Sequence, residues 1–116
     1  MLTFSHFISE SNDFKSINLG PHTKGMKKYS HGDNHVGYHD PEFKSGVTHK
    51  KLHSALVKAG YRYHRKDDGR IGGKDVTYHL YHKPAGPYAD HHLHIITPKG
   101  SGKVQTVEHK TIKDNS

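Results

Sequence analysis

The chain has 116 residues, among them 18 lysines and arginines, 11 aspartates and glutamates and 14 histidines, and its net charge is +7 with histidine neutral. This length is enough for one domain and too short for two. No apolar run approaches the roughly 18 residues that a membrane-spanning helix needs. Cysteine is absent, which excludes disulfides and thiolate metal sites. Hydrophobic residues make up only 30%, so we expect a thin core with part of the chain outside it.

The excess of positive charge extends along the whole chain. Such a charge attracts polyanions through counterion release, so it indicates a nucleic-acid partner rather than a membrane or a small metabolite. The histidines make the charge depend on pH, since an ordinary imidazole titrates near 6.5. The alternative interpretation is that the charge only keeps a small domain in solution.

Composition and pattern divide the chain into four predicted segments. We expect a leader over residues 1–10, a flexible basic arm over 11–46, a small domain over 47–109 and a disordered tail over 110–116. The arm is predicted because its apolar residues follow neither a helical nor a strand period, and because turn-forming glycine and proline interrupt it.

One helix is predicted over residues 49–59. Thr48 is placed to cap its amino end, and Gly60 stands where a glycine commonly ends a helix. Leu52 and Leu56 fall on one face at helical spacing, which predicts the side that meets the core.

Strand patterns follow over residues 61–65, 76–81, 92–96 and 104–108, separated by turns rich in glycine and proline. The predicted fold is α+β: one helix packed on a small antiparallel sheet of three to four strands, with a flexible N-terminal arm. In the predicted register, Leu52 and Leu56 pack on the following strand residues: Val76, Tyr78, Leu80, Leu93 and Ile95.

The same register gives the opposite face of the sheet arginine, histidine and tyrosine side chains, because residues two apart in a strand share a face. A surface of this kind suits phosphates and stacked bases. The predicted nucleic-acid-binding residues are Arg62, His64, Lys74, His79, Tyr81, His92 and His94. The alternative is that these are merely the solvated residues of a half-buried sheet.

A metal site is a further alternative on this face. His79, His92 and His94 would converge from adjacent strands, and zinc accepts three histidines with one position left open. The pattern places no carboxylate beside them, and no other cofactor is predicted. A nuclease using His79 with His92 or His94 is therefore an alternative to a protein that acts by binding alone.

Residues 48–97 resemble HicA-type toxins. The resemblance rests on the helix ending at Gly60, on the strand from Tyr61 to Arg65, and on the run from Thr77 to Pro84. That family has an α/β fold like the double-stranded-RNA-binding domain and cuts RNA with a histidine at the start of its second strand. The resemblance implies a small ribonuclease with His79 as its catalytic residue. The family's Gly-Ser-His-His is replaced here by Val76-Thr77-Tyr78-His79, and its closing helix has no counterpart.

The first ten residues, MLTFSHFISE, resemble the capsid-targeting sequence of internal head proteins of T4-type bacteriophages. In such phages the prohead protease cuts after a hydrophobic-x-Glu tripeptide, and Ile8-Ser9-Glu10 satisfies that pattern. The resemblance implies a scaffold partner, a place inside the virion beside packaged DNA, and ejection into the host cytoplasm to act on host defence or transcription. Removal of Glu10, the one charged residue of the leader, would raise the net charge from +7 to +8.

Two alternatives remain for this interpretation. The leader resembles an ordinary amphipathic N-terminus as well, and the domain would also suit an interaction module that binds one host protein and inhibits it.

Overall fold

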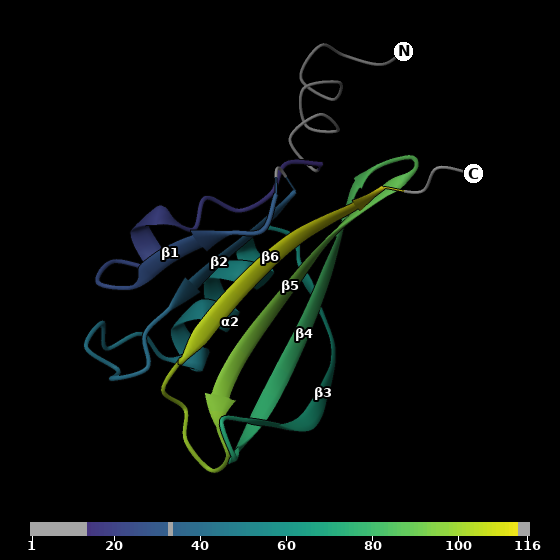
Figure 1. Cartoon of the computed structure of the whole chain (residues 1–116). Helices are drawn as coiled ribbons and strands as arrows, with labels where there is room; N and C mark the ends of the chain where they lie inside the picture. The colour runs from purple at the N-terminus through teal and green to yellow at the C-terminus, as the bar shows by residue number, and fades with distance from the viewer. Residues whose placement is uncertain (1–13, 33, 114–116) are drawn as a thin grey trace, which may run out of the picture.

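A computed structural model of the chain describes residues 14–32 and 34–113. The predicted leader, with Ile8, Ser9 and Glu10, lies outside the described residues. One six-stranded antiparallel sheet and one α-helix dominate the fold (Figure 1). The elements, in chain order, are η1 Gly20–His22, β1 Lys27–Ser30, β2 His35–His39, α2 His49–Lys58, β3 Arg62–Ile71, β4 Lys74–Gly86, β5 Ala89–Pro98 and β6 Thr106–Lys113.

The strands lie in the order β1-β2-β6-β5-β4-β3. The last strand, β6, therefore sits between the N-terminal hairpin and the β3-β4-β5 meander, and it joins the two in one sheet (Figure 1). In this view α2 lies behind the sheet and leaves the other face uncovered. We call that uncovered side the open face.

The predicted sheet of three to four strands with a flexible arm is wrong. The segment predicted as an arm contributes β1 and β2, and the sheet has six strands. These two strands are short, and β2 is partly buried on both faces, so neither has the alternation that marks a half-buried strand. β1 pairs with β2, and β2 pairs with β6, which lies far away in sequence.

β3, β4 and β6 are longer than the strands that the hydrophobic patterns predicted. β3 continues through Asp67-Asp68-Gly69, where a turn was predicted, because an exposed edge strand needs no apolar side chains. The hairpin turn lies at Gly72-Gly73, which the predicted turn region also included, and their φ angles of 59° and 80° fit a type I′ hairpin. β4 passes the predicted break at Pro84, and β6 extends to Lys113, beyond the predicted start of the tail.

The helix forms as its sequence predicts, one residue shorter. The Thr48 hydroxyl accepts a hydrogen bond from the Lys51 amide at 3.3 Å, which caps the first turn. Gly60 follows the last turn with a φ of +95°, the left-handed conformation that favours glycine. No helix among residues 14–32 and 34–113 is long and apolar enough to cross a membrane.

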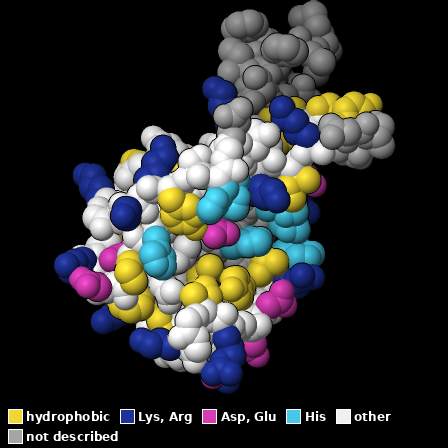
Figure 2. All heavy atoms as spheres, in the orientation of Figure 1, with side chains coloured by type: hydrophobic (Ala, Val, Ile, Leu, Met, Phe, Trp, Pro, Cys, Tyr) yellow, Lys and Arg dark blue, Asp and Glu magenta, His cyan; other side chains and the backbone are white. Residues whose placement is uncertain are grey.

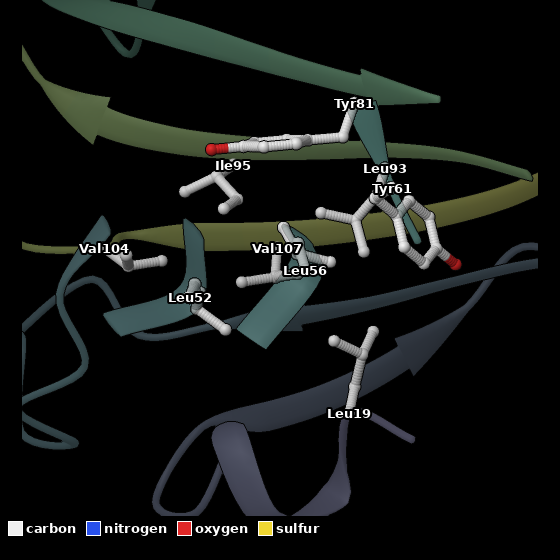
Figure 3. Packing of buried hydrophobic residues seen from close by; sticks show 9 residues of the cluster. All are labelled: Leu19, Leu52, Leu56, Tyr61, Tyr81, Leu93, Ile95, Val104 and Val107. Carbon is white, nitrogen blue, oxygen red and sulfur yellow. The ribbon is translucent and has the colours of Figure 1, made fainter. Parts of the chain in front are cut away.

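The core lies between α2 and the sheet (Figure 3). Leu52 and Leu56 are 1% and 0% exposed, and a leucine of the N-terminal segment closes the cluster from the far side of the helix. The buried hydrophobic residues of this cluster are Leu19, Leu52, Leu56, Tyr61, Tyr81, Leu93, Ile95, Val104 and Val107.

The predicted core was right for β5 and wrong for β4. Leu93 and Ile95 face the helix, but β4 contributes Tyr81 beside them, since Tyr81 pairs with Leu93. The predicted core residues of β4 lie on the open face, because Val76 pairs with Pro98, Tyr78 with Ile96 and Leu80 with His94. Val76 is nevertheless buried, at 2% exposure, but away from the helix. In β4, large side chains stand at both odd and even positions. The sequence pattern therefore did not indicate which of the two faces meets the helix.

Candidate nucleic-acid interface

Histidine side chains gather on the open face, with lysine and arginine around them (Figure 2). The pairing of five strands explains this grouping, because residues that pair across neighbouring strands stand side by side on the same face. Arg62 pairs with His82, and His82 pairs with His92. His92 pairs with Lys110, and Lys110 pairs with His35.

One row of cationic and titratable side chains therefore crosses β3, β4, β5, β6 and β2. Neighbouring strands are about 4.8 Å apart, so the row is about 19 Å long. His64 joins it through a bulge in β3 between Tyr63 and Arg65. We call these residues the basic row: Arg62, His64, His82, His92, Lys110 and His35.

Three imidazoles of the basic row lie against one another, the first pair stacked and the second tilted. The ring centroids of His64 and His82 are 4.5 Å apart with 17° between the planes, and those of His82 and His92 are 4.0 Å apart with 31°. Both faces of the His82 ring are thus covered by other imidazoles. Its ring edge, which carries the two nitrogens, is left for a ligand.

Two carboxylates border the basic row. Glu108 pairs with His94 and accepts a hydrogen bond from the Tyr29 hydroxyl at 2.7 Å, and its other oxygen lies 3.7 Å from His35 Nε2. Asp90 lies beyond the His82–His92 pair at the exposed end of the sheet. A shallow hollow beside Glu108 is lined by His35, His92, His94, Glu108, Lys110 and Ile112.

Burial lowers the pKa of three histidines on this face. For His82, partial burial is the main cause, and repulsion from His92 and His64 lowers the pKa further while Asp90 raises it. Burial likewise lowers the pKa of His92 and His94, against the attraction of Asp90 and Glu108 respectively. At neutral pH these rings are therefore uncharged, and they accept protons only at lower pH or when negative charge approaches.

The predicted site residues divide between the two faces. Arg62, His64, His92 and His94 lie together on the open face, as the sequence indicated. His79 and Tyr81 lie on the helix side, because Tyr81 pairs with the core residue Leu93. Lys74 is exposed at the opposite end of β4, away from the basic row.

Three members of the basic row were missed by the sequence interpretation: His82, Lys110 and His35. His82 was missed because it lies two residues after Leu80 and so shares its face, and the sequence assigned Leu80 to the core; the pairing of Leu80 with His94 places both residues on the open face instead. Lys110 and His35 belong to segments that the sequence assigned to the tail and the arm, so no register could be predicted for them.

A second group of titratable side chains lies between α2 and the sheet. The buried Tyr81 hydroxyl is 2.8 Å from His49 Nε2 and 2.7 Å from His53 Nδ1. The His49 ring stacks on His79 with centroids 3.8 Å apart, and His79 bonds Tyr63 and Thr97 through its two nitrogens. We call this the Tyr81 cluster: His49, His53, Tyr63, His79 and Tyr81.

Burial lowers the pKa of His49 to about 4, and the neighbouring His79 and His53 lower it further in the same direction. Burial also lowers the pKa of His79, with help from Lys66. Both ring nitrogens of His79 are already engaged within the protein, so the cluster has the character of a packed hydrogen-bond network.

The predicted zinc trio does not form. His92 and His94 lie on the open face and His79 on the helix side, so the three imidazoles point to opposite sides of the sheet. The same separation removes the predicted nuclease pairs of His79 with His92 or His94. Within the described part of the chain, no group of three or more histidine or carboxylate side chains is arranged to hold a metal ion.

Comparison of the chain with protein-family models, with curated proteins and with solved structures finds no match.

Proposed function

We propose that the protein binds nucleic acid through the phosphate backbone, with the basic row as its contact surface. The observation that carries the proposal is the register of five strands, which aligns Arg62, Lys110 and the imidazoles between them across one uncovered face. Fixed positive charge in such a line attracts a polyanion by counterion release.

The stacking of the imidazoles favours phosphates over bases as their ligands. An aromatic side chain that holds a base needs a ring face open to it. The faces of His82 are covered by His64 and His92, so this part of the row offers ring edges with hydrogen-bond donors. Each strand of a duplex carries a phosphate per 3.4 Å of helix axis, so a row about 19 Å long spans several. Contacts of this kind position a nucleic acid without reading its sequence.

The experiment removes the two fixed charges of the row. We expect Arg62→Gln with Lys110→Gln to weaken binding of a fluorescent single-stranded oligonucleotide by about tenfold near 0.1 M salt. The slope of log affinity against log salt should fall by about 1.4, since each single-strand phosphate contact contributes about 0.7. Fluorescence anisotropy across a salt series measures both quantities.

The matched control removes the same charge elsewhere. Lys58 on α2 and Lys99 after β5 are exposed and lie outside the basic row. Lys58→Gln with Lys99→Gln should change the affinity by less than about threefold, because the lost charges are distant from the contact. An equal loss in both variants would show that only net charge matters, and it would contradict an interface on the open face.

We also propose that this binding serves a packaged internal head protein of a T4-like phage, matured by cleavage after Glu10. Its support is the MLTFSHFISE leader together with a basic surface that is compatible with packaged DNA. Coexpression with the prohead protease of such a phage should give a product that begins at Ser11, as measured by mass spectrometry. Glu10→Ala should leave the chain uncut. An intact wild-type chain, or a cut at another site, would remove this part of the proposal.

A further inference from the structure

The middle of the basic row combines two opposed properties. The His82 ring is held between His64 and His92 at stacking distance, so a proton on any one of the three rings repels a proton on its neighbours. The same rings stand between Arg62 and Lys110, in the place where phosphates would gather. Without a ligand, the stacked imidazoles are therefore hard to protonate. A bound polyanion would make their protonation easier.

Charged and titratable groups face the stack from every neighbouring strand. The positive side chains are Arg62 and Arg65 of β3 and Lys110 of β6. The negative ones are Asp90 of β5 and Glu108 of β6, and Glu108 is already engaged by Tyr29 and lies close to His35. Other titratable groups on this face are His94 of β5, His35 and His39 of β2, Tyr78 of β4, and Asp67 of β3, which is ion-paired with Arg65 at 3.0 Å.

Asp90 is thus the one carboxylate near the His82–His92 pair that has no hydrogen bond or ion pair within the described part of the chain. It offsets one positive charge at most. The other charges needed to hold protons on three stacked rings would have to come from a ligand.

From this geometry we infer that nucleic-acid binding is coupled to proton uptake: phosphates at the basic row draw protons onto the stacked imidazoles His82 and His92. The inference rests on the proposed function and adds its regulation. The unbound rings are neutral near pH 7, since burial and mutual repulsion lower the pKa values of His82 and His92. Bound phosphates raise those pKa values, so between the two values the complex holds more protons than the separate partners.

The coupling has a definite sign. A complex that binds more protons becomes tighter as the pH falls, by about tenfold per pH unit for each proton taken up. We expect about one proton per bound chain near pH 6, and an affinity that rises by about tenfold from pH 7 to pH 6.

Isothermal titration calorimetry counts the protons directly. The full chain is titrated with a single-stranded oligonucleotide near pH 6 in cacodylate and in Bis-Tris, two buffers whose ionisation enthalpies differ. The difference between the two binding enthalpies gives the number of protons taken up. Circular dichroism at each pH verifies that the protein is folded.

The test variant is His82→Gln with His92→Gln, which keeps neutral hydrogen-bond donors on the row and removes the titration. We expect its proton uptake to fall to less than half of the wild-type value. His22→Gln, in η1 on the helix side, removes an imidazole away from the row and should leave the uptake unchanged. If the double variant takes up as many protons as the wild type, the stacked rings are not the acceptors and the inference is overturned.

The two proposals fail in different ways. Binding without any proton uptake overturns the coupling and leaves the nucleic-acid interface standing. Absence of binding at every pH overturns both. Tighter binding at lower pH together with uptake that is lost in His82→Gln/His92→Gln supports both.

Discussion

Among single residues, Lys83 is a buried cation that stabilises the fold and takes no part in the basic surface. Its side chain is 6% exposed, and its ammonium donates hydrogen bonds to the Ala59 carbonyl at 2.6 Å and the Lys15 carbonyl at 2.7 Å. Ala59 ends α2, where backbone carbonyls lack helical partners and the helix dipole favours a positive charge. Lys83 thus ties the end of the helix and the N-terminal segment to β4.

We expect Lys83→Met to lower the free energy of unfolding by about 1–3 kcal/mol, because it keeps the apolar stem and leaves two carbonyls without their donor. Urea denaturation followed by circular dichroism measures the loss. Lys58→Met, in the last turn of the same helix but exposed, should change the stability by no more than about 0.5 kcal/mol. Equal stability of Lys83→Met and the wild type would contradict the role of Lys83.

The basic row shows which single residues the sequence could identify. Arg62, His64 and His92 were assigned to the correct face of the sheet, because in the sequence they alternate with large apolar side chains such as Tyr63 and Leu93. His82 was missed because β4 carries aromatic, aliphatic or histidine side chains at almost every position, and only its pairing with β5 decides which face each residue takes. The burial of Lys83 could not be predicted either, since it depends on a helix end that meets β4 only in the folded chain.

Among the elements, the hairpin of β1 and β2 depends on a glycine that the sequence pattern could not explain. The Tyr29 ring lies directly over Gly37, and a Cβ atom at Gly37 would collide with that ring. From this position the Tyr29 hydroxyl reaches Glu108 on β6 and so connects the hairpin to the neighbouring strand. β1 and β2, whose residues follow no strand period in the sequence, are thus held by the packing of Tyr29 on Gly37 and by the pairing of β2 with β6.

We expect Gly37→Ala to displace Tyr29, to break its hydrogen bond to Glu108 and to lower the free energy of unfolding by about 1–3 kcal/mol. Gly102→Ala is the matched control, because a Cβ atom there would meet nothing within 4 Å. The control should stay within about 0.5 kcal/mol of the wild type in the same urea titration. If Gly37→Ala is as stable as Gly102→Ala, the close packing of Tyr29 on Gly37 does not contribute to the stability of the hairpin.

In the whole molecule, the histidines make the stability and the proposed function depend on pH in opposite directions. His109 is 8% exposed and hydrogen-bonds the Tyr61 hydroxyl at 3.1 Å, and burial, with repulsion from His91, lowers its pKa to about 4. His49 in the Tyr81 cluster has its pKa lowered to about 4 as well. An unfolded chain protonates the same rings near 6.5, so below that pH the unfolded state binds more protons than the folded one.

The stability that neutral His109 contributes is therefore fully present above pH 6.5 and is lost as the pH falls toward 4. With allowance for the water that reaches part of the ring, we expect this residue alone to account for about 2 kcal/mol between pH 7 and pH 4. His109→Gln, which keeps a partner for Tyr61, should flatten the decline. Urea denaturation at several pH values measures the slope, and a stability that stays constant or increases toward pH 4 would contradict this account.

An oligonucleotide should reverse part of this loss. A ligand that binds only the folded state stabilises it by RT ln(1 + [L]/Kd), and proton-coupled binding at the basic row makes Kd smaller at the pH where the unbound protein weakens. We therefore expect the rise in melting temperature caused by a saturating oligonucleotide to be larger near pH 5.5 than near pH 7.5. Thermal denaturation with and without the oligonucleotide measures this difference. In His82→Gln/His92→Gln the rise should be nearly the same at both pH values, because that variant keeps His49 and His109 and loses the two imidazoles of the open face that are inferred to take up protons.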